Sequence, residues 1–107
     1  MVPKTNKNIE VVKKFKRKLK KNIQINKLIF FGSRASGTFS ENSDFDLLII
    51  SDDFKGVQWY KRPIKFYLMW TVKYPVEFLC YTPDEIKKSA KKFGIISEAL
   101  KEGIEIK

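Results

Sequence analysis

The distribution of hydrophobic and polar residues along this 107-residue chain follows two periods. Apolar residues that recur every three or four positions predict a helix, and short continuous or alternating apolar runs predict a strand. The predicted helices cover residues 9–21, 63–72, 83–93 and 95–102. The predicted strands cover residues 28–31, 44–50, 75–81 and 104–106. Helices and strands are therefore interleaved along the chain.

Residue types that begin helices support these boundaries. Thr82 and Glu85 have the spacing of a capping box, in which each side chain accepts a hydrogen bond from the backbone N–H of the other residue. Between the first two strands, we expect Ser33 to cap a short helical turn over residues 34–36. Residues 1–8 are polar and contain a proline, so we expect the chain to begin with a flexible segment.

This order of elements predicts an α+β fold, with helices packed against a small mixed β-sheet. The link between the first two strands is short, which favours an antiparallel pair. A chain of this length builds one core, so we expect residues 1–107 to form a single domain. No apolar run approaches the roughly 20 residues that span a bilayer, and no signal-peptide pattern opens the sequence. We therefore expect no association with a membrane.

The formal net charge of +10 is concentrated near the N-terminus. Residues 1–27 contain ten Lys or Arg and one acidic residue, Glu10, whereas residues 28–107 contain twelve basic and eleven acidic residues. The helix over residues 9–21 is therefore strongly basic. Its charged side, over residues 13–21, is either a solvated surface or a patch for nucleic acid or an acidic partner.

The rarity of two residue types restricts the possible chemistry. The chain has no histidine, which excludes Ser-His-Asp catalysis, Cys-His catalysis and zinc bound by histidine. Its single cysteine, Cys80, has no partner for an internal disulfide, so we expect a cytoplasmic protein. Any catalysis must then use carboxylates, hydroxyls, lysine, arginine and a bound metal.

The candidate chemistry lies in residues 27–50. Asp44 and Asp46 are two positions apart on a predicted strand, so their side chains point to the same face. Two neighbouring carboxylates repel each other unless a cation lies between them or one is protonated. Because only oxygen ligands are close in sequence, the expected cation is hard, and Mg²⁺ is the leading candidate. Since Mg²⁺ is commonly shared between carboxylates and substrate phosphates, we expect a phosphate site nearby.

Gly32, Ser33 and Arg34 are the candidate phosphate-binding residues. A glycine lets phosphate approach the backbone, the amides of a first helical turn point at an anion, and the Ser and Arg side chains add hydrogen-bond donors. The segment is not a Walker P-loop, because Thr38 stands where that motif requires lysine.

The combined motif, FGSRA-x-G over residues 31–37 and SD-x-D over residues 43–46, resembles the signature of the DNA polymerase beta-like nucleotidyltransferases. Its likeness is greatest to their short prokaryotic members, the minimal nucleotidyltransferases, and it extends over about residues 27–106. The resemblance implies a polymerase beta-like core. It also implies that Asp44 and Asp46 hold two Mg²⁺ ions and that Gly32 and Ser33 bind a nucleoside triphosphate.

The resemblance implies a third metal-binding carboxylate on a later strand, where it would also help to activate the acceptor. Glu77, on the strand over residues 75–81, is the residue at that place, with its side chain on the same face as Leu79 and Tyr81. Members of the family most often have aspartate there. Catalytic competence therefore depends on whether Glu77 serves as the third acid.

The implied reaction is transfer of a nucleoside monophosphate, AMP from ATP, to a hydroxyl group. By resemblance to minimal nucleotidyltransferases, the acceptor is a tyrosine of a HEPN-type toxin partner, and the protein acts as an antitoxin. Two other classes of function stay open. One is a catalytically inactive module that keeps the fold and acts by complex formation, and the other is a nucleic-acid-binding protein that uses residues 13–21.

Overall fold

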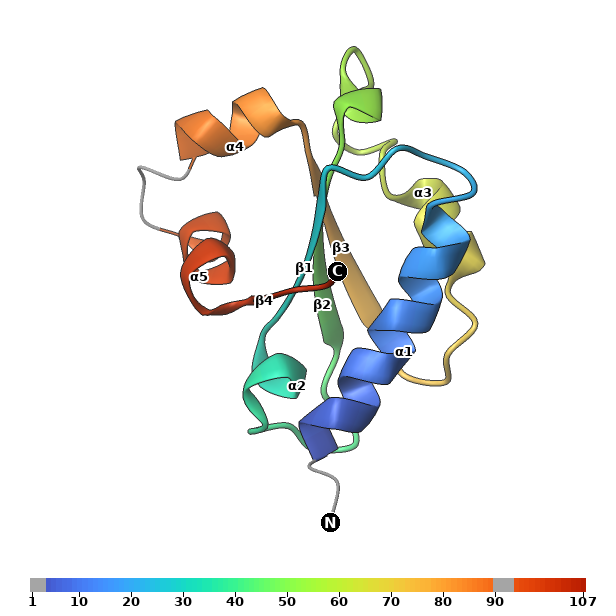
Figure 1. Cartoon of the computed structure of the whole chain (residues 1–107), viewed down its shortest axis with the longest axis vertical. Helices are drawn as coiled ribbons and strands as arrows, with labels where there is room; N and C mark the ends of the chain where they lie inside the picture. The colour runs from blue at the N-terminus through green and yellow to red at the C-terminus, as the bar shows by residue number, and fades with distance from the viewer. Residues whose placement is uncertain (1–3, 90–93) are drawn as a thin grey trace.

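Residues 4–89 and 94–107 are described by the computed structural model of the chain, in which a β-sheet lies between helices (Figure 1). The strands are β1 (Lys27–Phe31), β2 (Phe45–Ile50), β3 (Val76–Tyr81) and the short β4 (Ile104–Glu105). Their order across the sheet is β3-β2-β1-β4. β1 pairs antiparallel with both β2 and β4, whereas β2 and β3 are parallel. The predicted mixed sheet is therefore confirmed.

Helices cover both faces of the sheet, which is seen nearly edge-on in Figure 1. α1 (Lys4–Leu19) and α3 (Ile64–Met69) lie on one side, and α4 (Pro83–Ser89) and α5 (Ile95–Glu102) lie on the other. The short α2 (Ser33–Ser36) follows β1, and the 3-10 helix η1 (Asp52–Phe54) follows β2. Because β1 and β2 are antiparallel, these two short helices lie at opposite ends of the sheet. The predicted α+β class is confirmed.

β1, β2 and β3 contribute alternate side chains to two separate cores. The larger core lies between the sheet and α1 with α3, and its strand residues are Leu28, Phe30, Phe45, Leu47, Ile49, Phe78 and Cys80. The smaller core lies against α5 and contains Ile29, Phe31, Leu48, Ile50, Ile96 and Ala99. Successive side chains of a strand point to opposite faces, and the positions of Asp46 and Glu77 in their strands are those that face the smaller core. Both side chains therefore project on the face that α5 covers.

The N-terminal helix is longer at its start than the sequence predicted. α1 begins at Lys4, so residues 4–8 are helical rather than a flexible segment, while residues 1–3 lie outside the described part of the chain. The added turn is anchored by Asn8, whose buried side-chain amide donates a 3.2 Å hydrogen bond to the backbone oxygen of Arg34. A tertiary contact, rather than an apolar pattern, therefore supports the start of this helix.

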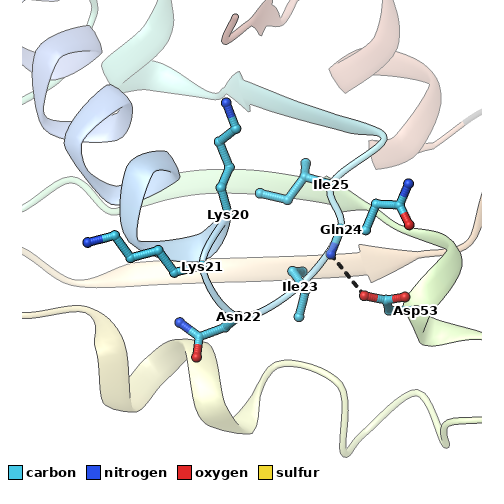
Figure 2. A pocket seen from close by; sticks show the side chains of 7 residues that line it. All are labelled: Lys20, Lys21, Asn22, Ile23, Gln24, Ile25 and Asp53. Atoms are coloured by element: carbon cyan, nitrogen blue, oxygen red, sulfur yellow. Dashed lines mark hydrogen bonds between the residues drawn. The ribbon is translucent and has the colours of Figure 1, made fainter.

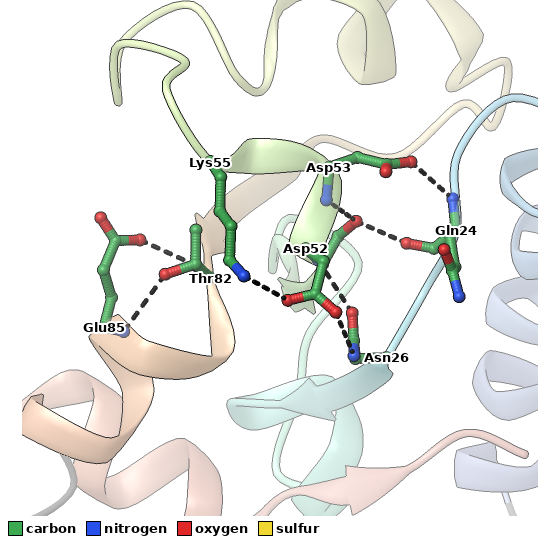
Figure 3. A network of polar contacts seen from close by, with 8 residues as sticks. Gln24, Asn26, Asp52, Asp53, Lys55, Thr82 and Glu85 are labelled. Atoms are coloured by element: carbon green, nitrogen blue, oxygen red, sulfur yellow. Dashed lines mark hydrogen bonds and ion pairs between the residues drawn. The ribbon is translucent and has the colours of Figure 1, made fainter.

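The connection from α1 to β1 is tied to the segment that follows β2 (Figures 2 and 3). The backbone N–H of Gln24 donates to the carboxylate of Asp53, and Asn26 and Asp52 exchange two hydrogen bonds. A pocket of about 520 Å³ lies between the two segments and is lined by residues 20–25 and Asp53 (Figure 2). It is at the end of the sheet opposite to α2, away from the candidate chemistry.

The helix boundaries agree with the sequence at the start of α4 and differ from it at the start of α2. The capping box is present, since the N–H of Thr82 donates to Glu85 at 2.8 Å and the N–H of Glu85 donates to the Thr82 hydroxyl at 3.2 Å (Figure 3). Residues 90–93 of the predicted helix lie outside the described residues. The cap of α2 is Gly32, and Ser33 is instead its first residue. Among the described residues, no helix is long and apolar enough to cross a membrane.

Candidate active site

Gly32 and Asp46 face each other where β1 ends. The register of β1 and β2 places Asp46 opposite Phe31, the residue before Gly32. Gly32 has a φ of +82°, which side chains disfavour, and a Cβ added there would overlap Oδ2 of Asp46 and lie 3.1 Å from its Cγ. Glycine therefore lets the turn into α2 pass directly against this carboxylate.

A pocket of about 350 Å³ opens at this turn. The turn itself, Asp46 and one side of α5 line it, through Phe31, Gly32, Ser33, Ser36, Thr38, Asp46, Ile95, Glu98 and Glu102. The first N–H groups of a helix have no acceptor within the helix, so the turn presents hydrogen-bond donors that suit an anion. Two of the three predicted phosphate-binding residues, Gly32 and Ser33, are thus placed in one pocket with Asp46.

The three predicted metal-binding carboxylates come from adjacent positions. Asp44 directly precedes β2, Asp46 lies within it, and Glu77 is opposite Asp46 in the parallel pairing of β2 with β3. Asp44 and Glu77 are exposed, whereas Asp46 is half-buried. Burial, followed by the negative charges of Glu77 and Asp44, raises the pKa of Asp46 to about 6. Asp44 and Glu77 are therefore close enough to Asp46 to disfavour its ionisation.

The chemistry of this donor set fits a hard divalent cation. Within residues 4–89 and 94–107, no three acidic or cysteine side chains already converge on a single point as ligands. The donors are nevertheless carboxylate oxygens alone, and a cation would offset the burial and the neighbouring negative charges that raise the pKa of Asp46. The charged residues that line the pocket, Asp46, Glu98 and Glu102, are all acidic. A polyphosphate would meet negative charge there unless it entered together with cations.

Arg34 has a different place from the one predicted. Its side chain is only 2% exposed, and Arg34 is not among the residues that line the pocket. Three rings lie 4.2–4.9 Å from its guanidinium carbon, those of Phe39, Phe45 and Tyr74. Three backbone oxygens of the loop before β2 accept its hydrogen bonds, those of Ser40, Glu41 and Ser43. Arg34 therefore holds the loop that leads to Asp44, and its side chain is directed into the fold rather than into the pocket.

Glu98 and Glu102 are the pocket residues that the sequence did not identify. They are four positions apart on α5, so they share one side of the helix. That spacing was visible in the sequence, but only the packing of α5 against the sheet shows that this side meets Gly32. Cys80 is no second reactive centre, because burial raises the pKa of its thiol to about 12.

α1 lies on the face of the sheet opposite to α5, which contributes Ile95, Glu98 and Glu102 to this pocket (Figure 1). Two basic side chains of α1 take part in the fold, since Lys16 donates to the backbone oxygen of Ile106 at 2.6 Å and Lys18 donates to the Thr71 hydroxyl at 3.3 Å. Among the other basic residues at positions 13–21, Lys13, Lys14 and Arg17 on α1 and Lys20 and Lys21 just after it are exposed. The predicted nucleic-acid patch is thus accessible in part and separate from the candidate active site.

This fold and this arrangement of a glycine turn beside strand carboxylates define a nucleotidyltransferase domain. The sequence matches the family model described as "Nucleotidyltransferase domain" over residues 12–106, and the chain therefore belongs to that family. The resemblance drawn from residues 31–46 is confirmed at this level.

Two individual proteins are similar to this chain. One is a Methanocaldococcus jannaschii protein named "Putative protein adenylyltransferase MJ0141", which is 29% identical over 100 residues, or 92% of this chain and 97% of that protein. The other is a crystal structure from Sulfolobus solfataricus described as a "putative nucleotidyltransferase". It superimposes with a TM-score of 0.65 over 79% of this chain and 76% of that one. At 17% identity, this second likeness shows the fold.

Proposed function

We propose that the protein is a Mg²⁺-dependent nucleotidyltransferase that moves AMP from ATP to a hydroxyl group of another protein. The observation that carries this proposal is the position of Asp44, Asp46 and Glu77 beside the pocket at Gly32 and Ser33. Family membership supports nucleotidyl transfer, and the arrangement of these residues supplies the groups that such a transfer requires.

In this proposal the turn at Gly32 and Ser33 binds the triphosphate. Because Gly32 has no side chain, phosphate oxygens approach its backbone, and Ser33 contributes its backbone N–H and its hydroxyl. Both residues line the pocket that also contains Asp46, so the nucleotide is held next to the carboxylates.

Asp44, Asp46 and Glu77 would hold two Mg²⁺ ions. When bound, these ions neutralise the triphosphate and the charge that develops on the attacking and leaving oxygens. Asp46 binds a proton more tightly than an ordinary aspartate, because burial and its two acidic neighbours raise its pKa. Binding of a cation is therefore coupled to loss of that proton.

Glu77 is the proposed general base as well as a ligand. It is exposed on β3, so an acceptor hydroxyl can reach it. Glu77 accepts the hydroxyl proton while the hydroxyl oxygen bonds to the α-phosphorus of ATP. The bond from the α-phosphorus to the bridging oxygen then breaks, and pyrophosphate leaves.

The acceptor that we propose is a tyrosine of a HEPN-type toxin partner, which would make this protein an antitoxin. The motif over residues 31–46 resembles that of minimal nucleotidyltransferases, for which such a partner is expected. The name of the similar Methanocaldococcus jannaschii protein specifies a protein adenylyltransferase, which supports a protein acceptor and AMP as the transferred group.

The test is a transfer assay with ATP, Mg²⁺ and a HEPN-type protein as the acceptor, followed by intact-mass and peptide mass spectrometry. We expect an AMP adduct on a tyrosine of the partner, and its loss in the Asp44→Asn/Asp46→Asn variant or on addition of EDTA. An adduct that persists in that variant would exclude the two aspartates from the mechanism. Binding of ATP with Mg²⁺ but no transfer would favour the inactive binding module.

A further inference from the structure

Large apolar side chains are exposed in one short part of the chain. Six of the seven exposed large hydrophobic residues in the described part of the protein lie between residues 57 and 68. They are Val57, Trp59, Tyr60, Ile64, Tyr67 and Leu68, which together form what we call the 57–68 surface. Trp59 is 75% exposed and Leu68 is 81% exposed. An apolar concentration of this kind marks a surface that is covered in a complex.

The way in which α3 packs on the domain explains why part of the 57–68 surface is exposed. Its six residues bury Phe66 in the larger core, while Ile64, Tyr67 and Leu68 are spaced three and four positions apart on the opposite, exposed side. A helix that displays such a stripe to solvent has the pattern of an interface helix with no partner.

Arg62 fixes the preceding segment to the body of the domain. Its side chain is 8% exposed, and it donates to the backbone oxygens of Val57 at 2.9 Å and Cys80 at 3.1 Å. It also pairs with both carboxylate oxygens of Glu85, at 2.6 and 3.2 Å. The 57–68 surface is therefore preorganised, which lowers the entropic cost of docking.

Two hollows lie on either side of Arg62. One, of about 480 Å³, is formed by Trp59, Tyr67 and residues of the edge strand β3, including Glu77. The other, of about 350 Å³, has Val57 and Ile64 on its wall. Concave hollows of this size accept the side chains of a protein, whereas a lipid surface packs best against a convex apolar face. A protein that fills the first hollow lies next to the proposed general base.

The charge around these hollows indicates what kind of protein fits. Residues 55–75 contain five basic residues and no acidic one. Lys55 is paired with Asp52 and Arg62 with Glu85, so the positive charge of the segment comes from Lys61, Lys65 and Lys73. Lys61 and Lys65 line the second hollow, whereas the first has Glu77 on its wall. A second copy of the chain, packed through the same surface, would place like charges opposite each other. A partner that carries aspartate or glutamate beside its apolar residues is complementary.

We propose that the 57–68 surface is the docking site for the protein acceptor, which contributes an apolar segment flanked by acidic residues. Docking there brings an acceptor hydroxyl to the side of the site where Glu77 lies. This inference rests on the proposed function for the identity of the acceptor, so its test measures docking separately from transfer.

The first experiment measures binding of the HEPN-type protein by calorimetry. It compares the unmodified chain, the Asp44→Asn/Asp46→Asn variant and the Trp59→Ser/Leu68→Ser variant. We expect the first two to bind alike and the third to bind at least roughly tenfold more weakly, as for central interface residues. Its binding of ATP with Mg²⁺ should be unchanged, because neither Trp59 nor Leu68 lines the nucleotide pocket. Equal binding by all three, or no binding by the unmodified chain, overturns the proposal.

A matched pair of charge variants tests complementarity. The two double variants are Lys61→Glu/Lys65→Glu and Lys14→Glu/Arg17→Glu. Each replaces two basic residues with glutamate and so lowers the net charge of the protein from +10 to +6. All four side chains are exposed, but the second pair lies on α1. We expect the first pair to weaken acceptor binding about tenfold and the second pair to leave it within about twofold. Equal losses would show a general charge effect and overturn the proposal.

Two further measurements test whether a second copy of the chain or a membrane, rather than the acceptor, binds the 57–68 surface. The protein alone is sedimented to determine its oligomeric state, and it is mixed with vesicles that contain phosphatidylserine. Self-association or vesicle binding that depends on Trp59 would assign the surface to a second copy or to a membrane, against the proposal. Docking without AMP transfer would overturn the proposed function alone. Transfer at the normal rate by Trp59→Ser/Leu68→Ser would overturn the docking site alone.

Discussion

The carboxylate of Asp46 occupies the space in which any side chain at position 32 would begin. A Cβ on Gly32 would overlap Asp46 Oδ2 and would be 3.3 Å from Asp46 Cβ. Glycine is therefore required at this position for two reasons, a φ of +82° and the close approach of the acid. The relationship joins the two halves of the candidate site, since one residue belongs to the proposed phosphate-binding turn and the other to the carboxylate group.

Gly32→Ala should therefore damage nucleotide binding far more than strain alone explains. Gly56→Ala is the matched control, because Gly56 has a similar φ of +75° but no atom within 4 Å of an added Cβ. Both changes should cost about 1–2 kcal/mol of unfolding free energy from backbone strain. Only Gly32→Ala moves Asp46, and we expect a loss of about 100-fold in binding of ATP with Mg²⁺, measured by calorimetry. Equal binding by the two variants would contradict the role given to this contact.

Asp46 should make the metal-free protein less stable as the pH rises. Its pKa in the folded protein, about 6, is above the ordinary value of 3.8, so the folded state holds the proton more tightly than the unfolded state does. Stability from this group is complete below pH 3.8 and is lost as the pH rises through about 6. Asp46→Asn should therefore raise the Tm at pH 7.5 in EDTA and have little effect near pH 3.5. Thermal unfolding across this range measures it.

The matched control for that experiment is Glu41→Gln, which removes an exposed loop carboxylate. Its Tm at pH 7.5 in EDTA should stay close to that of the unmodified protein. Added Mg²⁺ should raise the Tm of the unmodified protein at pH 7.5 and leave that of Asp46→Asn unchanged, because the cation relieves the repulsion only when the carboxylate is present. A destabilised Asp46→Asn at pH 7.5 in EDTA would contradict the electrostatic account.

The parts of this structure that local pattern specifies were predictable from the sequence. Strand parity placed Asp46 and Glu77 on the faces where they are found, and the spacing of Thr82 and Glu85 predicted the capping box that forms. Such features depend on residues within a few positions of each other.

What the sequence did not show depends on partners that are distant along the chain. The burial of Arg34 was not visible in the sequence, because its partners, a loop 6–9 residues away and the ring of Tyr74, are brought to it only by folding. The start of α1 had no apolar signal, since Asn8 is buried by a contact with residue 34. The approach of α5 to Gly32, which adds Glu98 to the pocket, is likewise a result of tertiary packing.

Replacement of Arg34 should destabilise the protein even without nucleotide. Arg34→Ala removes the hydrogen bonds that Arg34 donates to three loop carbonyls and the cation–π contacts of its guanidinium with three rings. The change should cost roughly 2–4 kcal/mol of unfolding free energy. Arg34→Lys keeps the charge but not the planar set of donors, so it should recover only part of the loss. Urea unfolding in the absence of ATP measures both. Unchanged stability together with weaker ATP binding would instead support the prediction that Arg34 contacts phosphate.

The ion pair of Arg62 with Glu85 should stabilise the protein only when Glu85 is ionised. The hydrogen bond from Arg62 is the largest cause that lowers the pKa of Glu85 from its usual 4.5. Its contribution is therefore complete above pH 4.5 and is lost as the pH falls through the lowered pKa. Glu85→Gln should reduce the Tm at pH 7 and converge with the unmodified protein near pH 3. Asp84→Asn, at an exposed neighbour in the same helical turn, should show a smaller loss at pH 7.

Glu77 determines whether the carboxylate group is an active centre. It lies opposite Asp46 on a neighbouring strand, and its glutamate side chain is one methylene longer than the aspartate expected from the family resemblance. Glu77→Gln keeps this length but removes the charge and the proton acceptor, so we expect transfer to fall about 10²–10⁴-fold. Glu77→Asp keeps the carboxylate and should retain measurable transfer. The control is Glu105→Gln, an exposed carboxylate on β4 at the other edge of the sheet, which should transfer normally. If Glu77→Gln transfers AMP as fast as this control, the base is another group and Glu77 is only a surface residue of β3.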